Sequence, residues 1–303
     1  MKMKAAAFTN KMILVRGGGD LATGVIHKLH QSGYQVLILE CDRPSAIRRH
    51  VAFCEAVYDG TAEVEGVVCR RITENDIRTQ CRKCWAQGEI PLLTDTHGKH
   101  IRELEPEAVI DAILAKKNLG TRISDAPLVI GIGPGFTAAG DCHFVIETQR
   151  GEHLGEVIRE GSAIPNTGIP GNIGGYTVER LLKASADGIM HPVARIGDVV
   201  KKGQIVARCG DEPVYARLHG IVRGMLQEGV PVKKRIEDRR CGCKDRGKNF
   251  VIRFRIKHER SETELRKQSI LSIKQNKKVV RTTYLSILFM VKYKKVWAEY
   301  LPQ

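Results

Sequence analysis

Three consecutive glycines, one residue after a short apolar run, are the strongest chemical signal in this sequence. Gly17, Gly19 and Ala22 have the G-x-G-x-x-(G/A) spacing of dinucleotide-binding loops. Glycines leave no side chain between backbone and ligand, and a following helix points unpaired N–H groups at an anion. Glu40, at the end of the next apolar run, is placed to accept hydrogen bonds from a ribose. The pattern predicts nucleotide or dinucleotide binding.

The alternative is a tight strand–helix turn that binds nothing. Gly18 and Asp20 complete the loop, and the Asp20 carboxylate would repel a phosphate. Gly19 and Gly24 also have the outer spacing of a Walker A loop, but Val25-Ile26 replaces its Lys-Ser/Thr pair. Ordinary P-loop ATP hydrolysis is therefore disfavoured.

Further ligand contacts are expected from two arginines and two more glycine-rich turns. Forked hydrogen bonds from paired arginines suit a phosphate or another oxyanion, although solvated surface arginines are an equal alternative. Glycines after a strand lie where open α/β sheets bind ligands. Three such loops favour one composite pocket. The candidate contacts are Arg48 and Arg49, then Gly131, Gly133 and Gly135, and finally Asn166 and Gly168.

A metal or proton-transfer site is a weaker hypothesis. Asp141, His143 and Glu147 bracket a short apolar run, and their side chains are types that bind metals or move protons. A buried polar trio that fixes the loop is the alternative. Cys81 and Cys84 have the spacing of half a zinc site, but no second pair matches them, so we expect reduced thiols on a helix over residues 74–87.

The elements that must position these residues alternate between strand and helix patterns. Apolar runs predict strands at 12–15, 36–39 and 127–130, and shorter runs recur at 56–58, 67–68 and 90–93. Helical spacing begins at Leu21 and ends near Gly33, and helices are also expected over 106–117 and about 176–184. This order predicts an α/β fold, a Rossmann-like and mostly parallel sheet with Gly-rich loops.

The pattern changes at residue 188. A strand–turn–strand unit at 197–207 recurs in part at 229–234, as in the small all-β sandwich of lipoyl and biotinyl domains. Those domains carry their prosthetic group on a lysine of the central hairpin. The corresponding hairpin here, Gly210–Pro213, has no lysine, so we expect no attached lipoyl or biotin.

The net charge of +15 comes almost entirely from the C-terminal tail. Residues 233–303 hold 21 Lys and Arg against 7 Asp and Glu, whereas the rest is nearly neutral. A basic tail can bind nucleic acid. A frameshift near residue 235 is favoured instead, because allowed codons for residues 235–243, read one nucleotide later, encode Gly-Leu-Lys-Ile-Ala-Asp-Val-Asp-Ala. That reading restores the Lys-Lys-Gly of the first repeat, so the tail is expected to be poorly ordered.

Four parts follow from these patterns. A Rossmann-like α/β domain is expected over 1–120, and its continuation with Gly-rich ligand loops over 121–187. A truncated lipoyl/biotinyl-like β module is expected over 188–234 and the basic tail over 235–303. No window approaches eighteen uncharged apolar residues, so neither a membrane span nor membrane association is expected. We expect a cytoplasmic location.

Several motifs in order resemble an accessory-protein family of the selenium-dependent molybdenum hydroxylase system. They are residues 14–24, 43–49, 131–138 and 166–171, and the resemblance covers about residues 12–234. It implies a bacterial cytoplasmic protein that helps to mature a xanthine-dehydrogenase-like hydroxylase. The implied partners are the hydroxylase apoprotein or other maturation proteins, with homo-oligomers left open. The resemblance does not settle whether a reaction is catalysed.

Two main functions remain. The first is a maturation factor that holds a nucleotide-bearing molybdenum cofactor, or a selenium donor, and delivers it to a partner. The second is an NAD(P)-dependent oxidoreductase, which rests on the glycine spacing and Glu40 but lacks an evident Tyr-x-x-x-Lys or hydride-site histidine. Nucleic-acid binding rests only on the tail and is not expected.

Overall fold

The chain folds into two compact units. The computed structural model describes residues 9–166, 175–234 and 250–256. The first unit holds residues 9–44 and 51–166 of this part, and the second holds residues 45–50, 175–234 and 250–256. The second unit therefore begins before residue 188 and also takes in a short segment that follows the second strand of the first unit.

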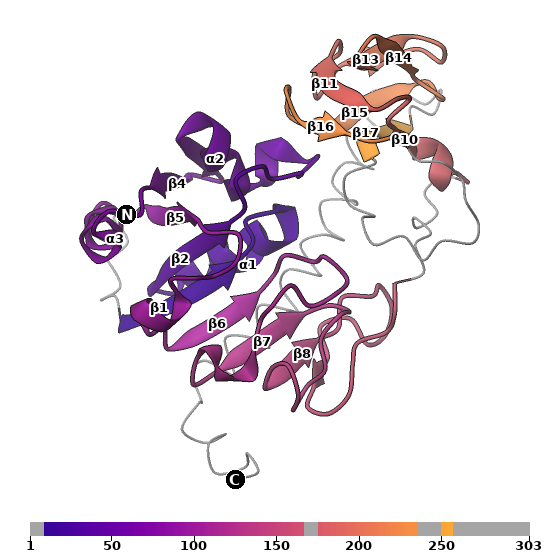
Figure 1. Cartoon of the computed structure of the whole chain (residues 1–303). Coiled ribbons are helices and arrows are strands. Elements are labelled where there is room, and N and C mark those ends of the chain that lie inside the picture. Colours follow the sequence, from indigo (N-terminus) through magenta and orange to yellow (C-terminus); the bar gives the residue numbers. More distant parts are fainter. Residues whose placement is uncertain (1–8, 167–174, 235–249, 257–303) are drawn as a thin grey trace, which may run out of the picture. The chain divides into compact units, whose positions relative to one another are not determined.

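The first unit is built on a nine-stranded sheet of order β3-β4-β5-β2-β1-β6-β7-β8-β9 (Figure 1). Its inner pairs are parallel, while the edge pairs β3–β4 and β8–β9 are antiparallel. The sheet is thus mixed but mostly parallel, as expected for an α/β fold. The strands are β1 (Thr9–Arg16), β2 (Tyr34–Glu40), β3 (Thr61–Val64), β4 (Val67–Ile72), β5 (Ile90–Thr94), β6 (Ala108–Asp111), β7 (Val129–Ile132), β8 (Phe144–Ile146) and β9 (Val157–Ile158).

The helices of this unit are few and mostly short. They are α1 (Asp20–Gln31), α2 (Ala56–Asp59), α3 (Ile77–Ala86) and α4 (Ile101–Leu104), with 3₁₀ turns at η2 (Phe53–Glu55) and η3 (Ile123–Asp125). A further 3₁₀ turn, η1 (Arg49–Val51), lies where the chain returns from the second unit to the first. Within the described ranges, no helix is long and apolar enough to cross a bilayer.

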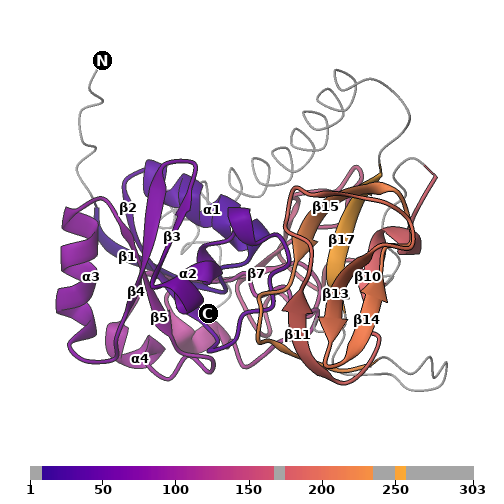
Figure 2. The ribbon, with the colours of Figure 1, turned by 90° about the horizontal axis from the view of Figure 1, so that it is seen from above.

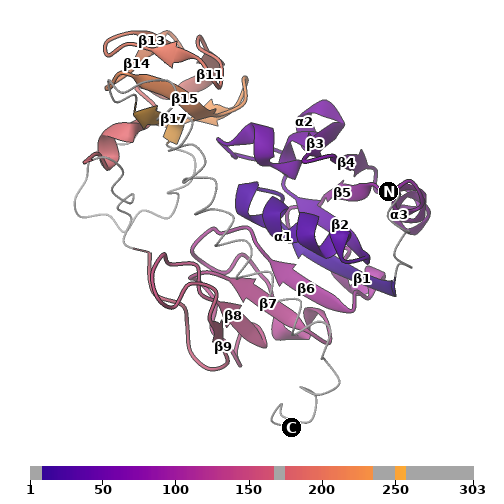
Figure 3. The ribbon, with the colours of Figure 1, turned by 180° about the vertical axis from the view of Figure 1, so that it is seen from behind.

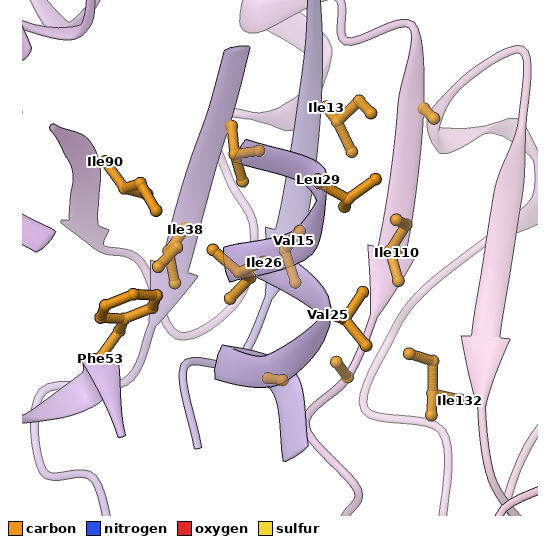
Figure 4. Packing of buried hydrophobic residues seen from close by; sticks show 14 of the residues in the cluster. Ile13, Val15, Val25, Ile26, Leu29, Ile38, Phe53, Ile90, Ile110 and Ile132 are labelled. Carbon is orange, nitrogen blue, oxygen red and sulfur yellow. The ribbon is translucent and has the colours of Figure 1, made fainter. Parts of the chain in front are cut away.

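Alternate residues of each central strand enter two separate cores. In β1, Ile13 and Val15 face the core that contains α1, whereas Leu14 faces the core that contains α3 and α4. This alternation with a period of two is what a strand buried on both faces requires. In Figure 4, Val25 and Ile26 of α1 lie against side chains of the sheet.

Two expected elements of the first unit are wrong. The run at 56–58 forms α2 instead of a strand, and the helical pattern at 106–117 contains β6. The four residues of β6 are buried on both sides, so its continuous apolar run carries no period that separates helix from strand.

The second unit consists of two four-stranded antiparallel sheets (Figure 2). One has the order β10-β17-β15-β12 and the other β14-β13-β11-β16. Val206, Met190 and Val222, one from each of three strands, are fully buried. The elements are η4 (Val178–Arg180), β10 (Leu181–Lys183), β11 (Gly188–Pro192), β12 (Val199–Val200), β13 (Ile205–Cys209), β14 (Glu212–Tyr215), β15 (Gly220–Met225), β16 (Pro231–Val232) and β17 (Phe250–Ile256).

Two expectations for this unit differ from the structure. The helix expected over 176–184 is replaced by η4 and β10. Residues 250–256, within the tail, form β17, which pairs with β10 and β15. Apolar residues alternate with arginines over the last five residues of this segment, Phe-Val-Ile-Arg-Phe-Arg-Ile, and that period favours a strand. The rest of the tail, 235–249 and 257–303, lies outside the described residues.

The packing of α1 predicts a pH dependence of stability. Burial lowers the pKa of His30, and the neighbouring His27 lowers it further. The unfolded chain therefore binds more protons than the folded chain once the pH falls below about 6.5, so stability should fall as the solution is acidified through that range. We expect His30→Gln to lose stability less steeply than wild type in urea unfolding below about pH 6.5. Equal slopes would contradict the assignment.

Candidate functional site

The strand order of the first unit reverses between β1 and β6. The chain leaves β1 through α1 toward β2 on one side, while β6, β7 and β8 extend the sheet on the other (Figure 3). Ligands of open α/β sheets bind outside the carboxyl ends of the strands at such a switch point. Gly17, Gly18 and Gly19 lie there, immediately after β1.

The three glycines of this loop have different surroundings. Gly17 has φ +93°, and a Cβ on it would lie 2.9 Å from Ile113 Cα. A Cβ on Gly18 would lie 3.0 Å from the backbone nitrogen of Cys54, whereas one on Gly19 would meet nothing within 4 Å. Gly17 and Gly18 are therefore explained by packing within the protein. Gly19 alone of the three leaves room for a ligand at the backbone.

The first turn of α1 follows directly. Gly19 is the N-cap in extended conformation and its carbonyl accepts from Thr23 N at 2.7 Å. The first amides of an α-helix have no partner inside the helix and carry its positive dipole end. Asp20 is also in this turn, and Ala22 is buried below it. The turn offers N–H donors to an anion, with the carboxylate of Asp20 opposing the binding of a highly charged one.

The side chain of Glu40, at the end of β2, accepts hydrogen bonds from the backbone and so stabilises this loop. Its Oε2 accepts a hydrogen bond from Gly18 N at 2.7 Å and its Oε1 accepts one from Cys41 N at 2.8 Å. Burial raises the pKa of Glu40, while these two amides act in the opposite direction. Both oxygens expected to serve a ribose thus already hold backbone amides.

A small apolar cavity of about 10 Å³ lies between α1 and the ends of β6 and β7. Such a space holds about one water molecule, so a nucleotide could lie only outside it, over the strand ends. The lining residues are Leu21, Ala22 and Val25 of α1 with Ala112, Leu114, Ile132 and Thr148.

A buried ion pair next to the loop was missed by the sequence reasoning. Arg16 and Asp111, the last residues of β1 and β6, are each 1% exposed, and Arg16 Nη1 lies 3.5 Å from Asp111 Oδ2. Thr121 Oγ1 donates to the same Asp111 oxygen at 2.6 Å and accepts a hydrogen bond from Arg16. Nothing in the sequence marks this trio, because its members are far apart in the chain.

The second glycine loop is filled by the protein itself. A Cβ on Gly131 would lie 2.5 Å from the Phe136 ring, and one on Gly135 would lie 2.5 Å from Lys117 N. Gly133, at φ +81°, faces Thr148 Oγ1 in the same way. These glycines permit close packing after β7 and do not leave an open surface for a ligand.

The remaining expected contacts belong elsewhere. Arg48 and Arg49 are part of the second unit. Arg49 Nε donates to Met225 O at 3.0 Å, and its Nη1 donates to Gln227. Asn166 is exposed at the end of a described range, and Gly168 lies outside the described residues.

The three residues of the proposed metal site each bind backbone amides. Asp141 accepts from Thr137 N at 2.8 Å and His143 Nδ1 accepts from Val129 N at 3.0 Å. Glu147 accepts from three amides, those of residues 148, 149 and 164. Throughout the described ranges, no group of three or more His, Cys, Asp or Glu side chains is arranged to hold a metal ion. The trio fixes loops, as in the alternative interpretation.

Cys81 and Cys84 are free thiols on α3, inside the core on that face of the sheet. Burial is the main cause that raises the pKa of Cys81 to about 12, and it also raises that of Cys84. Thiols that stay protonated are poor metal ligands and poor nucleophiles. The structure explains this pair as core residues.

An Asp–His pair at the end of β5 is the second feature that the sequence reasoning missed. Asp95 Oδ2 lies 3.1 Å from His100 Nδ1 and accepts from His100 N, while Oδ1 accepts from Lys99 N. Burial opposes ionisation of Asp95, but these hydrogen bonds outweigh it and hold its pKa below the usual range. Two histidines and an aspartate within Asp-Thr-His-Gly-Lys-His, directly after an apolar run, were a signal that could have been used.

Comparison with known proteins gives one relative by sequence. No protein-family model matches the chain. Over 223 residues it is 46% identical to the uncharacterized protein YqeB of Escherichia coli (strain K12). The aligned region covers 74% of this chain and 41% of YqeB. The chain therefore spans less than half the length of the curated relative it matches.

Solved structures add no fold assignment. The ectoine utilization protein EutE (DoeB) from Ruegeria pomeroyi gives a TM-score of 0.23 at 9% identity, covering 83% of this chain and 88% of that one. An aspartoacylase family protein from Mesorhizobium loti gives 0.24 at 8% identity, with the same shares covered. At these scores the two structures carry no argument about the fold of this chain.

The different surroundings of Gly17 and Gly19 predict different effects of a serine substitution on stability. Gly17→Ser forces a side chain into the left-handed region and against the backbone of Ile113, so we expect it to lose about 2–3 kcal/mol of unfolding free energy. Gly19→Ser places a hydroxyl at the N-cap in open space and should change stability by less than about 0.5 kcal/mol. Urea unfolding of both variants measures this, and similar losses would contradict it.

Proposed function

We propose that this chain is an accessory factor that binds a nucleotide-bearing ligand during maturation of a selenium-dependent molybdenum hydroxylase. The observation that carries the proposal is the open backbone at Gly19. Gly19 is the N-cap of α1, at the point where the strand order of the mostly parallel sheet reverses. This is the place and the geometry at which α/β sheets bind the phosphates of nucleotides.

The particular hydroxylase system is proposed from motifs. The resemblance rests on residues 14–24, 43–49, 131–138 and 166–171, which occur in the order of the family. The proposed ligand is the dinucleotide form of the molybdenum cofactor or a selenium donor that carries a nucleotide. The proposed partners are the hydroxylase apoprotein or other maturation proteins, in the cytoplasm.

The second unit is proposed to be a lipoyl/biotinyl-like module that serves as a docking piece without a swinging arm. Two four-stranded antiparallel sheets and a partial sequence repeat support this. The turn between β13 and β14 consists of Gly210 and Asp211, and neither residue can carry an amide-linked prosthetic group.

An NAD(P)-dependent oxidoreductase is the second candidate. It is favoured by the position of Glu40 at the end of β2, where such enzymes place the acid that binds ribose. Against it, both oxygens of Glu40 accept amides of the protein, from Gly18 and Cys41. The maturation factor remains the preferred proposal.

Nucleotide binding is tested at Gly19. A valine there should fold normally but cover the first amides of α1, so affinity for a nucleotide should fall at least about tenfold, or about 1.4 kcal/mol. Isothermal titration with CDP, GDP, ADP and NAD measures the effect. Gly140→Val is the control and should bind as wild type does, because Gly140 is in an exposed turn of the same unit where a Cβ makes only ordinary contacts, with Thr137 at 3.5 Å. Unchanged affinity in the Gly19 variant would defeat the proposal.

The absence of a swinging arm is tested by intact mass. Protein produced in a host with active lipoyl and biotin ligases should have the mass of the bare polypeptide, because the central hairpin has no lysine to modify. An added mass of either group would overturn this part of the proposal.

A further inference from the structure

The Asp95–His100 pair lies beside the candidate nucleotide site. Asp95 directly follows β5, and its N–H donates to Glu40 O at 2.8 Å, which extends the pairing of β5 with β2. Strands in a sheet are about 4.8 Å apart, so the end of β5 is roughly 10 Å from the end of β1. A bound nucleotide extends over such a span from phosphate to base.

The loop that carries His100 also reaches the end of β1. Gly98 has φ +69°, and a Cβ on it would lie 3.8 Å from Arg16 Nε. Arg16 immediately precedes the glycine loop, and its charge is already paired with Asp111. The loop from Asp95 to His100 thus crosses the end of β2, from β5 toward the switch point.

The contact with Asp95 orients the imidazole and favours the tautomer that carries a proton on Nδ1. The carboxylate of Asp95, 2% exposed in its side chain, is an acceptor for Nδ1–H of His100. A proton on Nδ1 leaves the lone pair on Nε2. His100 Nε2 has no hydrogen-bond partner among the described residues, and the His100 side chain is 14% exposed, so the ring edge is partly accessible to a ligand.

Glu40 is not available to bind the ribose of a nucleotide. In dinucleotide-binding folds the acid at the end of the second strand accepts hydrogen bonds from ribose hydroxyls. Here both its oxygens already accept backbone amides. In the loop after the next strand, β5, the partly accessible ring of His100 offers a further acceptor at the same edge of the sheet.

We propose that His100 Nε2 accepts a hydrogen bond from a ribose hydroxyl of the nucleotide bound at Gly19, and that Asp95 positions the ring for this contact. The inference rests on the proposed function, because it assigns a further contact to the same ligand. It predicts a preference for ribonucleotides over their dideoxy forms that depends on one histidine.

The first test is calorimetric and uses the full chain. ADP and 2′,3′-dideoxy-ADP are titrated into wild type, His100→Phe and His97→Phe, with the matching CDP and GDP pairs in parallel. Wild type should bind the ribose form about tenfold more tightly. His100→Phe should bind both forms equally and weakly. His97→Phe, at an exposed histidine of the same loop, should keep the wild-type preference.

A second test reads the ring itself. Nitrogen-15 NMR of the histidine side chains, assigned by loss of a signal in His100→Gln, should show a protonated Nδ1 and a bare Nε2 in wild type. In Asp95→Asn the same ring should populate the other tautomer and the ribose preference should shrink. Thermal melts of each variant identify a loss of fold, and the wild-type NMR result does not depend on any variant folding.

The outcomes separate the two proposals. If Gly19→Val abolishes binding but His100→Phe keeps the ribose preference, the His100 contact is wrong and the proposed function stands. If wild type binds none of the nucleotides, both are wrong. A protonated Nε2 in wild type would overturn the positioning by Asp95.

Discussion

The buried ion pair between Arg16 and Asp111 is the contact on which the rest of the first unit depends. It joins the last residues of β1 and β6, the two central strands between which the strand order reverses. Removing one partner of such a pair leaves an uncompensated buried charge and typically costs 3–5 kcal/mol. Beside the pair, Ala112 N donates to Arg16 O at 2.8 Å, and the next residues, Gly17 and Ile113, lie close together.

Hydrogen bonds between side chains and the backbone fix the loops that surround this ion pair. Glu40 holds Gly18, and Thr23 links the carbonyl of Gly18 to the amide of Phe53. Asp95 fixes the neighbouring loop in the same manner. Most acidic groups at this edge of the sheet are therefore used to shape loops. What remains for a ligand is backbone at Gly19 and, as proposed, the imidazole of His100.

The sequence was informative where local pattern decides the structure and failed where distant residues meet. The runs at 12–15 and 36–39 lie within β1 and β2, and glycine spacing located the loop between β1 and α1. The helix predicted over residues 106–117 was wrong, because β6 is buried on both faces and its sequence shows no alternation. Glycine content alone could not separate Gly19, which is open, from Gly131 and Gly135, which pack against the protein. That distinction depends on Phe136 and Lys117.

Hydrogen–deuterium exchange with and without nucleotide tests the central claim most directly, that the first turn of α1 receives the phosphates. Amides of helical first turns exchange readily because they lack partners inside the helix. The account predicts that a saturating nucleotide slows exchange of the amides of residues 19–22, with smaller protection over 95–100. Protection confined to other strand ends, or to the second unit, would contradict it.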